Sequence, residues 1–161
     1  MVWCRRQACQ DRISQGESVT TIRIPGEMRG KGRPRFARLK LQPGAKGPGV
    51  RTFTDAKTVS MENWVKTCAV QVWQRPPLAG AVRIGLEIGV AVPASWSRKK
   101  RDAALANEIH PTSKPDLDNA LKLVADALNG IVWADDKQIT EAVIRRRYVA
   151  EPCTVLTVAE A

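Results

Sequence analysis

Four aspartates occur as two close pairs in the C-terminal half of the chain. Asp116 and Asp118 are separated by one residue, and Asp135 is followed directly by Asp136. Clustered carboxylates repel one another and raise each other's pKa unless a cation compensates their charge. A hard divalent cation such as Mg²⁺ prefers carboxylate, water and phosphate oxygens. The two pairs therefore predict a magnesium site, if the fold brings them together.

Such a site suits phosphodiester hydrolysis. A magnesium ion held by a few carboxylates can polarise a phosphodiester and position a water for attack, an effect of several kcal/mol. Lys122 lies four residues after Asp118 and four before Asp126. It could meet the additional negative charge of the transition state. It could also form ion pairs with both aspartates along one helix face, each worth about 0.2 to 0.5 kcal/mol.

Helix capping is another explanation for the first pair. Pro115 favours an extended Lys114, so a helix would begin at Asp116 with Asp118 in its first turn. Negative charge at a helix N-terminus stabilises by about 0.3 to 1 kcal/mol per group, which alone could account for one aspartate. Capping explains the second pair poorly, because it returns after one helix and a short apolar segment, where the chain could pass near the helix start.

The chain as a whole is strongly basic. Its 161 residues include 26 Lys and Arg against 16 Asp and Glu, a formal net charge of +10. A field of that sign attracts polyanions, so nucleic acid is the partner that charge favours. We expect no membrane association, because no amphipathic basic helix, lipid anchor or transmembrane segment is evident. Four cysteines without C-x-x-C spacing and a single histidine exclude a structural zinc site and favour a reducing cytoplasm.

Two basic segments could neutralise DNA phosphates. Residues 29–51 are rich in Gly and Pro and contain no acidic residue, which is typical of a solvated loop but also suits a phosphate-binding arm, and the net charge favours the arm. Residues 97–101 open a short predicted helix that ends at Ala106, and their charges could also form a solvated face. The candidate DNA-binding residues are Lys31, Arg33, Arg35, Arg38, Arg98, Lys99, Lys100, Arg101 and Lys114, with Arg145, Arg146 and Arg147 as further candidates.

The elements that must position these residues follow from the spacing of apolar side chains. Alternation predicts strands at 20–24, 82–90, 139–149 and 154–158. Apolar residues three or four apart predict helices at about 55–74 and 116–129. Trp64 and Trp73 are interpreted as packing residues rather than nucleobase platforms. The predicted fold is α/β (α+β), a single domain over 19–161 with a mixed β-sheet and two main helices packed on it, preceded by an N-terminal extension at 1–18.

The acidic segments resemble the RusA family of Holliday junction resolvases. The family pattern is Asp-x-Asp-Asn-x-x-Lys on a helix, followed by Asp-Asp after a Trp or another aromatic. This chain reads Asp116-Leu-Asp118-Asn119-Ala-Leu-Lys122, then Asp126-Ala-Leu, then Trp133-Ala-Asp135-Asp136-Lys-Gln138. The specific match covers about residues 114–139, and the order of elements agrees more loosely over roughly 20–160. The N-terminal extension and the basic stretch 95–113 depart from the pattern.

The resemblance implies a homodimeric bacterial or phage endodeoxyribonuclease that requires Mg²⁺, with Mn²⁺ as a substitute, and nicks opposed strands of a four-way DNA junction. It also implies that Asp116, Asp118 and Asp136 hold the metal and that Lys122 assists catalysis. A C₂ dimer would present two equivalent active sites to a two-fold junction. Two alternatives are a nuclease for flaps or other branched DNA, and a non-catalytic DNA-binding module whose aspartates only cap a helix.

The resemblance also distinguishes between the two aspartates of the second pair. Adjacent residues of an extended chain point to opposite sides, so we expect one of Asp135 and Asp136 to face the metal. The family pattern favours Asp136.

Overall fold

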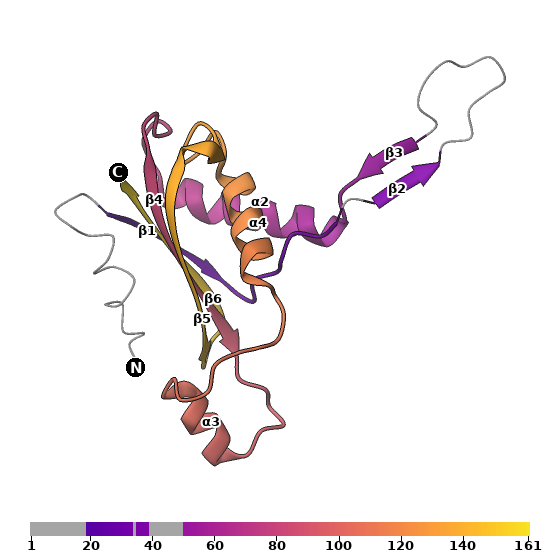
Figure 1. Ribbon diagram of the computed structural model, residues 1–161, viewed down its shortest axis with the longest axis vertical. Helices are drawn as coiled ribbons and strands as arrows, with labels where there is room; N and C mark the ends of the chain where they lie inside the picture. Colours follow the sequence, from indigo (N-terminus) through magenta and orange to yellow (C-terminus); the bar gives the residue numbers. More distant parts are fainter. Residues whose placement is uncertain (1–18, 34, 39–49) are drawn as a thin grey trace.

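A four-stranded sheet and three α-helices make up most of the described chain (Figure 1). The computed structural model describes residues 19–33, 35–38 and 50–161, so the predicted extension at 1–18 lies outside it. The strands of the sheet are β1 (Thr20–Pro25), β4 (Val82–Ala91), β5 (Ile139–Val149) and β6 (Cys153–Glu160). The helices are α2 (Ala56–Val72), α3 (Arg98–Leu105) and α4 (Leu117–Leu128). The predicted single-domain α+β fold is confirmed.

The sheet is mixed, with the strand order β1-β6-β4-β5. β4 pairs in parallel with β5 and antiparallel with β6, and β1 pairs antiparallel with β6. Parallel strands require a crossover connection, because the chain must return to the same end of the sheet. Here the crossover contains α3, α4 and the 3₁₀ helix η1 (Asp136–Gln138). Both acidic pairs therefore lie on one connection, between β4 and β5.

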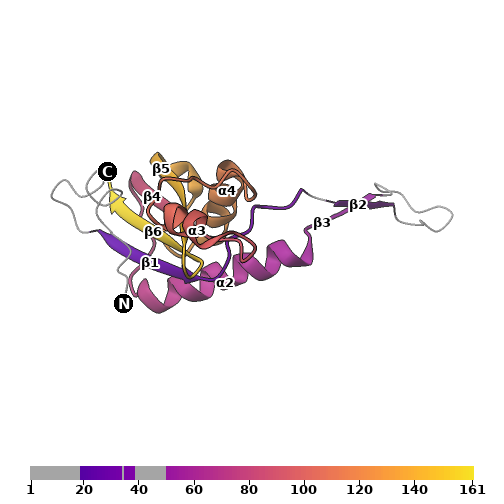
Figure 2. The ribbon, with the colours of Figure 1, turned by 90° about the horizontal axis from the view of Figure 1, so that it is seen from below.

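The core lies between the sheet and helices α2 and α4. Alternate residues of β4, such as Ile84 and Leu86, are completely buried, as the period of two predicts. Val65 of α2 and Leu123 of α4 are completely buried against them. α2 contacts both β1 and α4, and Figure 2 shows it running alongside β1. In the described part of the chain, no helix has the length and apolar character needed to cross a bilayer.

A two-stranded hairpin projects from this body (Figures 1 and 2). It consists of β2 (Arg35–Arg38) and β3 (Val50–Phe53), which pair antiparallel within the basic segment 29–51. Its aromatic side chains face solvent, with Phe36 72% and Phe53 45% exposed. The basic segment therefore includes a projecting hairpin, which the sequence analysis did not predict.

Candidate active site

Helix α4 begins directly after Asp116, as predicted. Asp116 has an extended backbone (φ −69°, ψ 142°) and occupies the N-cap position, but its side chain makes no capping hydrogen bond. Its carboxylate instead accepts a hydrogen bond from the Asn119 side-chain amide at 3.4 Å. Asp118 lies in the first turn of α4 and is exposed. Helix capping therefore does not account for the carboxylate of Asp116, which is accessible to a ligand.

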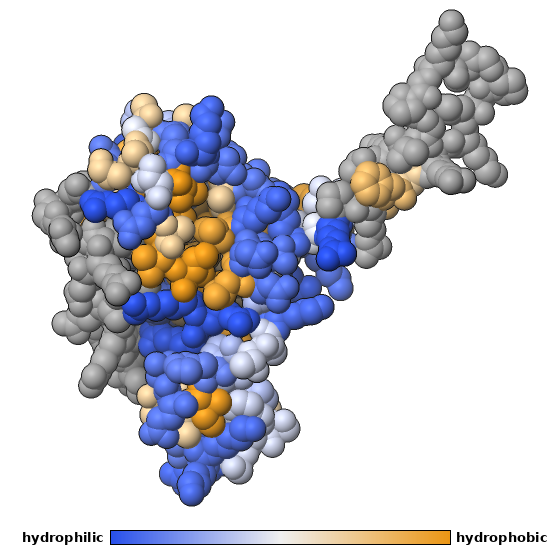
Figure 3. Space-filling view, viewed as in Figure 1, coloured by the Kyte–Doolittle hydropathy of each residue, from blue (hydrophilic) through white to orange (hydrophobic). Residues whose placement is uncertain are grey.

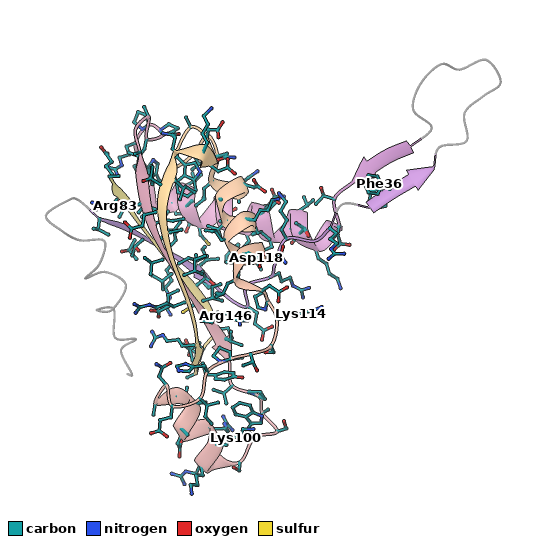
Figure 4. The ribbon with its side chains drawn as sticks, viewed as in Figure 1. Phe36, Arg83, Lys100, Lys114, Asp118 and Arg146 are labelled. Carbon is teal, nitrogen blue, oxygen red and sulfur yellow. The ribbon has the colours of Figure 1, made fainter. Side chains whose placement is uncertain are left out.

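Arg146 of β5 holds the loop that enters α4. Its Nη1 donates hydrogen bonds to the carbonyl oxygens of Ser113 at 2.5 Å and Pro115 at 2.7 Å. These carbonyls flank Lys114, whose peptide bond to Pro115 is cis. Figure 4 shows Arg146 on the sheet, next to the chain that carries Lys114 toward α4. Arg146, one of the candidate phosphate ligands, thus links the sheet to the start of the acidic motif.

Replacing Arg146 should weaken this link. Arg146→Ala removes two hydrogen bonds from a charged donor, and a bond of that kind typically contributes about 1.5 to 3 kcal/mol. Because the contacts are partly exposed, we expect the free energy of unfolding to fall by about 2 kcal/mol in urea titrations. Arg145→Ala, at an exposed neighbouring position on β5, is the control and should cost about 0.5 kcal/mol or less. Equal losses from the two replacements would contradict a specific clamp.

The second acidic pair lies at the 3₁₀ helix η1, so the premise that both aspartates sit in an extended chain is wrong. Asp135 is the N-cap, and its carboxylate accepts from the backbone N–H of Lys137 at 3.0 Å. The Lys137 ammonium lies 3.2 Å from the other oxygen of that carboxylate. Asp136, the first residue of η1, is exposed. Because the carboxylate of Asp135 already contacts the backbone and the ammonium of Lys137, Asp136 is the more available metal ligand of the two.

Contacts on both sides of the acidic pair attach η1 to the body. The Gln138 side-chain amide donates to the carbonyl oxygens of Leu78 at 2.9 Å and Gly80 at 2.7 Å. Trp133 is completely buried, and its Nε1 donates to the side chain of Asn129 at 2.9 Å. Trp133 and Gln138 flank the second acidic pair in the sequence, but their types and spacing alone predict no role for either. Their contacts show that both position the loop that carries the aspartates.

Lys137 lowers the pKa of Asp135, first through the hydrogen bond from its backbone N–H and then through its side chain. A carboxyl whose pKa is lower in the folded state stabilises the fold above its unfolded pKa of about 4, and this stabilisation is lost as the pH falls through the folded pKa. Asp135→Asn keeps a capping oxygen but removes the charge. We expect the variant to be less stable than the wild type at neutral pH, with the difference shrinking below about pH 4. Urea titrations across this range measure it, and a constant difference would contradict a role for the charge.

Asp116 and Asp118 lie at the start of α4, whereas Asp136 lies in η1, which follows the other end of that helix. Asp116, Asp118 and Asp136 are all exposed, and none has an ion pair within the described residues. In the same part of the chain, no three acidic, histidine or cysteine side chains are grouped closely enough to hold a metal ion as they stand. Arg146, late in β5, holds the start of α4, whereas η1 precedes the first residue of β5 and is bonded to Leu78 and Gly80 before β4. The expectation that the second acidic pair returns to the start of the helix is therefore wrong, because the crossover carries the chain to the other end of the sheet.

A hollow of about 390 Å³ lies between the starts of α2 and α4. Its lining includes the cationic residues Arg29, Lys57 and Lys114, together with Asp116 and Asn119. Among the three predicted metal ligands, Asp116 is the one that lines it. The hollow thus places cations, which attract phosphate groups, next to the carboxylate of Asp116 at the start of α4.

The basic segment before β2 forms part of the wall of this hollow and is held there by backbone hydrogen bonds. Lys31 N–H donates to the carbonyl oxygen of Asn119 at 3.0 Å, and Gly32 N–H donates to the Thr58 hydroxyl at 3.1 Å. Gly30 allows the close approach, since a Cβ at this position would lie 3.1 Å from the Cβ of Asn119. The segment is therefore attached to both helices.

The side chains of Lys31 and Lys122 differ in their surroundings. The Lys31 ammonium forms an ion pair with Asp126 and lies 3.7 Å from a carboxylate oxygen of Glu62. Lys122 has no ion pair in the described part of the chain, so the pairs considered for it with Asp118 and Asp126 are not formed. The charge of Lys31 is thus already compensated, whereas that of Lys122 is available. The role of Lys31 as a phosphate ligand stays a prediction.

The other candidate DNA ligands lie on or next to β2 and on α3. Arg33 is exposed before β2, while the side chains of Arg35 and Arg38 lie outside the described part. The residues Arg98, Lys99, Lys100 and Arg101 are exposed on α3. Figure 4 shows Lys100 and Phe36 far apart on the molecule, and Figure 3 shows hydrophilic surface over much of α3 and α4. The role of these residues as DNA ligands stays a prediction.

Comparison with known proteins defines the class of this protein. Residues 25–159 match the family described as Endodeoxyribonuclease RusA, so the protein is a nuclease, in the class of hydrolases. The chain belongs to the RusA family, as the resemblance of residues 114–139 indicated. Its members depend on a divalent metal and act on branched DNA junctions. Membership argues against the alternative of a non-catalytic DNA-binding module.

A curated relative matches most of the chain. The sequence is 30% identical over 131 residues to a protein of Bacillus subtilis (strain 168) named Uncharacterized protein YqaN. The alignment covers 80% of this chain and 87% of the relative. The similarity therefore extends well beyond the acidic motif.

Proposed function

We propose that this protein resolves four-way DNA junctions by paired nicks in opposed strands, using Mg²⁺ held by Asp116, Asp118 and Asp136, with Mn²⁺ able to replace it. The observation that carries the proposal is the start of α4. There the exposed carboxylate of Asp116, which makes no capping hydrogen bond, lies beside a hollow whose lining includes several cations. Asp136 of η1 is the third ligand in this proposal on the strength of the family pattern, since η1 lies at the other end of the crossover from the start of α4. Family membership supports the same chemistry.

The bound metal would polarise the scissile phosphodiester and favour ionisation of the attacking water. Residues of the chain provide the remaining functions. Arg29, Lys57 and Lys114 would bind the phosphates that flank the scissile bond, since all three line the hollow next to Asp116. Lys122, whose charge is available, would stabilise the additional negative charge of the transition state.

Two side chains would hold the backbone that carries the carboxylates in place before the substrate binds. Arg146 fixes the loop before Asp116, and Gln138 fixes the turn that carries Asp136. Both connect the acidic crossover to more rigid parts of the fold. A site built on the ends of anchored elements loses little energy to reorganisation when charge develops in the reaction.

A homodimer is part of the same proposal. β5 forms one edge of the sheet, and Figure 3 shows apolar surface gathered between β5 and α4. Partly buried apolar residues of these elements include Leu117, Leu121 and Ile144. Exposed sheet edges and apolar patches favour association. Sedimentation equilibrium should therefore give twice the chain mass of 17.7 kDa, and a monomer at assay concentrations would contradict the paired-nick mechanism.

The substrate is tested with three end-labelled DNAs that share one strand, namely a four-way junction, a flap and a linear duplex. With Mg²⁺ present, we expect nicks at symmetry-related positions in two opposed strands of the junction and no cutting of the duplex. Mapping both 5′-labelled strands on a denaturing gel locates the nicks. Cutting of the flap with an intact four-way junction would replace this proposal with the broader class of branched-DNA nuclease.

A further inference from the structure

A second hollow, of about 420 Å³, adjoins the first. It is lined by Arg29, Ala56, Lys57, Ser60, Met61 and Trp64. Arg29 and Lys57 line both hollows, so these two cations stand where the hollows meet. The lining of the second hollow contains no acidic residue, whereas Asp55 and Asp116 line the first. The second hollow therefore combines positive charge with an aromatic wall.

Trp64 differs from the tryptophans that pack in the core. Trp73 and Trp133 are 5% and 0% exposed, whereas Trp64 is 44% exposed on α2. The Nε1 of Trp64 donates a hydrogen bond to the carbonyl oxygen of Pro25 at 2.9 Å, at the end of β1. This bond anchors one edge of the indole without burying the ring. Packing, the role expected from its helical spacing, leaves the exposed part of Trp64 unexplained.

We propose that the second hollow binds a nucleobase of the substrate strand, stacked on the indole of Trp64, while Arg29 and Lys57 hold the adjoining phosphate. Aromatic side chains stack with any base, and neighbouring cations follow the backbone of a single strand. This inference rests on the proposed function, because its ligand is the DNA whose phosphates occupy the first hollow. It adds a subsite that receives one unstacked base next to the candidate metal site.

Charge identifies the occupant. The dimer contact proposed above lies on β5 and α4, whereas this hollow is lined by Arg29 and Lys57 without an acidic residue, so its local charge disfavours a basic protein surface. A DNA strand is instead attracted by the same two cations. A base at a branch point or in a single strand enters such a subsite at lower cost than a base in a duplex, because less stacking and pairing must be broken. The subsite would thus favour branched over linear DNA.

Binding of a fluorescent single-stranded oligothymidylate, measured by anisotropy in the presence of chelator, tests the subsite without cleavage. We expect Trp64→Ala to weaken binding about tenfold and Trp64→Phe, which retains a ring, to weaken it about threefold or less. Val70→Ala is the matched control, because Val70 is 54% exposed on the same helix and outside the hollow. It should bind as the wild type does. Equal weakening by the alanine and phenylalanine variants, or none by either, would overturn the proposal.

A strand of abasic sites provides a second test, in which the wild type alone already reports whether a base contributes to binding. If a base stacks on Trp64, the wild type should bind the abasic strand about tenfold more weakly than oligothymidylate, and Trp64→Ala should bind both strands alike. Equal wild-type affinity for the two strands would contradict stacking. A changed oligomeric state of Trp64→Ala with unchanged DNA affinity would identify the hollow as a protein interface instead. If base dependence is found but the four-way junction is not cut, the proposed function fails and the subsite stands.

Discussion

Asp118→Asn is expected to abolish nicking of a four-way junction while leaving its binding intact. The change keeps the shape of the side chain but removes a charged metal ligand. Because metal assistance is worth several kcal/mol, its loss should slow the reaction about 10³-fold or more. Binding should be equal or tighter, because one negative charge facing the phosphates is removed. Single-turnover nicking with Mg²⁺ gives the rate, and fluorescence anisotropy in chelator gives the affinity.

Asp102→Asn is the matched control for this result. Asp102 is an exposed aspartate on α3, where it lies 3.9 Å from Arg98, away from the acidic crossover residues. Its replacement makes the same chemical change and should leave the nicking rate within about twofold of the wild type, as is usual for an exposed site. If Asp118→Asn nicks at a similar rate to Asp102→Asn, Asp118 is not a metal ligand.

Junction affinity is expected to fall about 10³- to 10⁵-fold when the salt concentration rises from about 50 to 200 mM, which is the behaviour of a protein that contacts about six to ten phosphates. The chain has a net charge of +10, and its exposed cations include Lys114 and the basic face of α3. Release of counterions from the DNA causes the salt dependence. Anisotropy titrations in chelator measure it, and a response close to flat would remove these basic residues from the DNA interface.

Single replacements separate the cations that contact DNA from those that do not. Lys99 is exposed on α3, and Lys99→Ala should reduce the slope of log affinity against log salt by about 0.9 if it contacts one phosphate. Lys31 is already paired with Asp126 and lies near Glu62. Its replacement should therefore change the slope less than that of Lys99, and the opposite order would show that DNA displaces those acidic partners.

The body of the fold could be predicted because its signals are local. The alternation along β4 and the apolar stripe of α4 each come from residues close in sequence, and burial of one face follows directly. The β2–β3 hairpin could not be predicted in the same way. Its short strands, with Phe36 and Phe53 among basic residues, lie beside Gly- and Pro-rich sequence that is typical of loops.

In the candidate site, too, features set by neighbouring residues could be predicted, and features set by contacts between distant residues could not. Pro115 and the helical period predicted that Asp116 would stand at a helix entrance, because both effects act within a few residues. The clamp by Arg146 joins positions more than thirty residues apart, and the ion pair of Lys31 with Asp126 joins positions 95 residues apart. Nothing in the local sequence indicates such pairs. Trp64 was interpreted as packing for the same reason, since its exposure depends on how β1 and α2 meet.

The most direct test is whether the carboxylates of α4 and η1 act on one metal ion. A labelled four-way junction is incubated with the wild type or Asp136→Asn, first in chelator and then after addition of excess Mg²⁺. We expect no product from either protein in chelator, and nicking by the wild type alone once Mg²⁺ is added. Nicking in chelator, or nicking by Asp136→Asn at the wild-type rate, would contradict a metal site shared between the two elements.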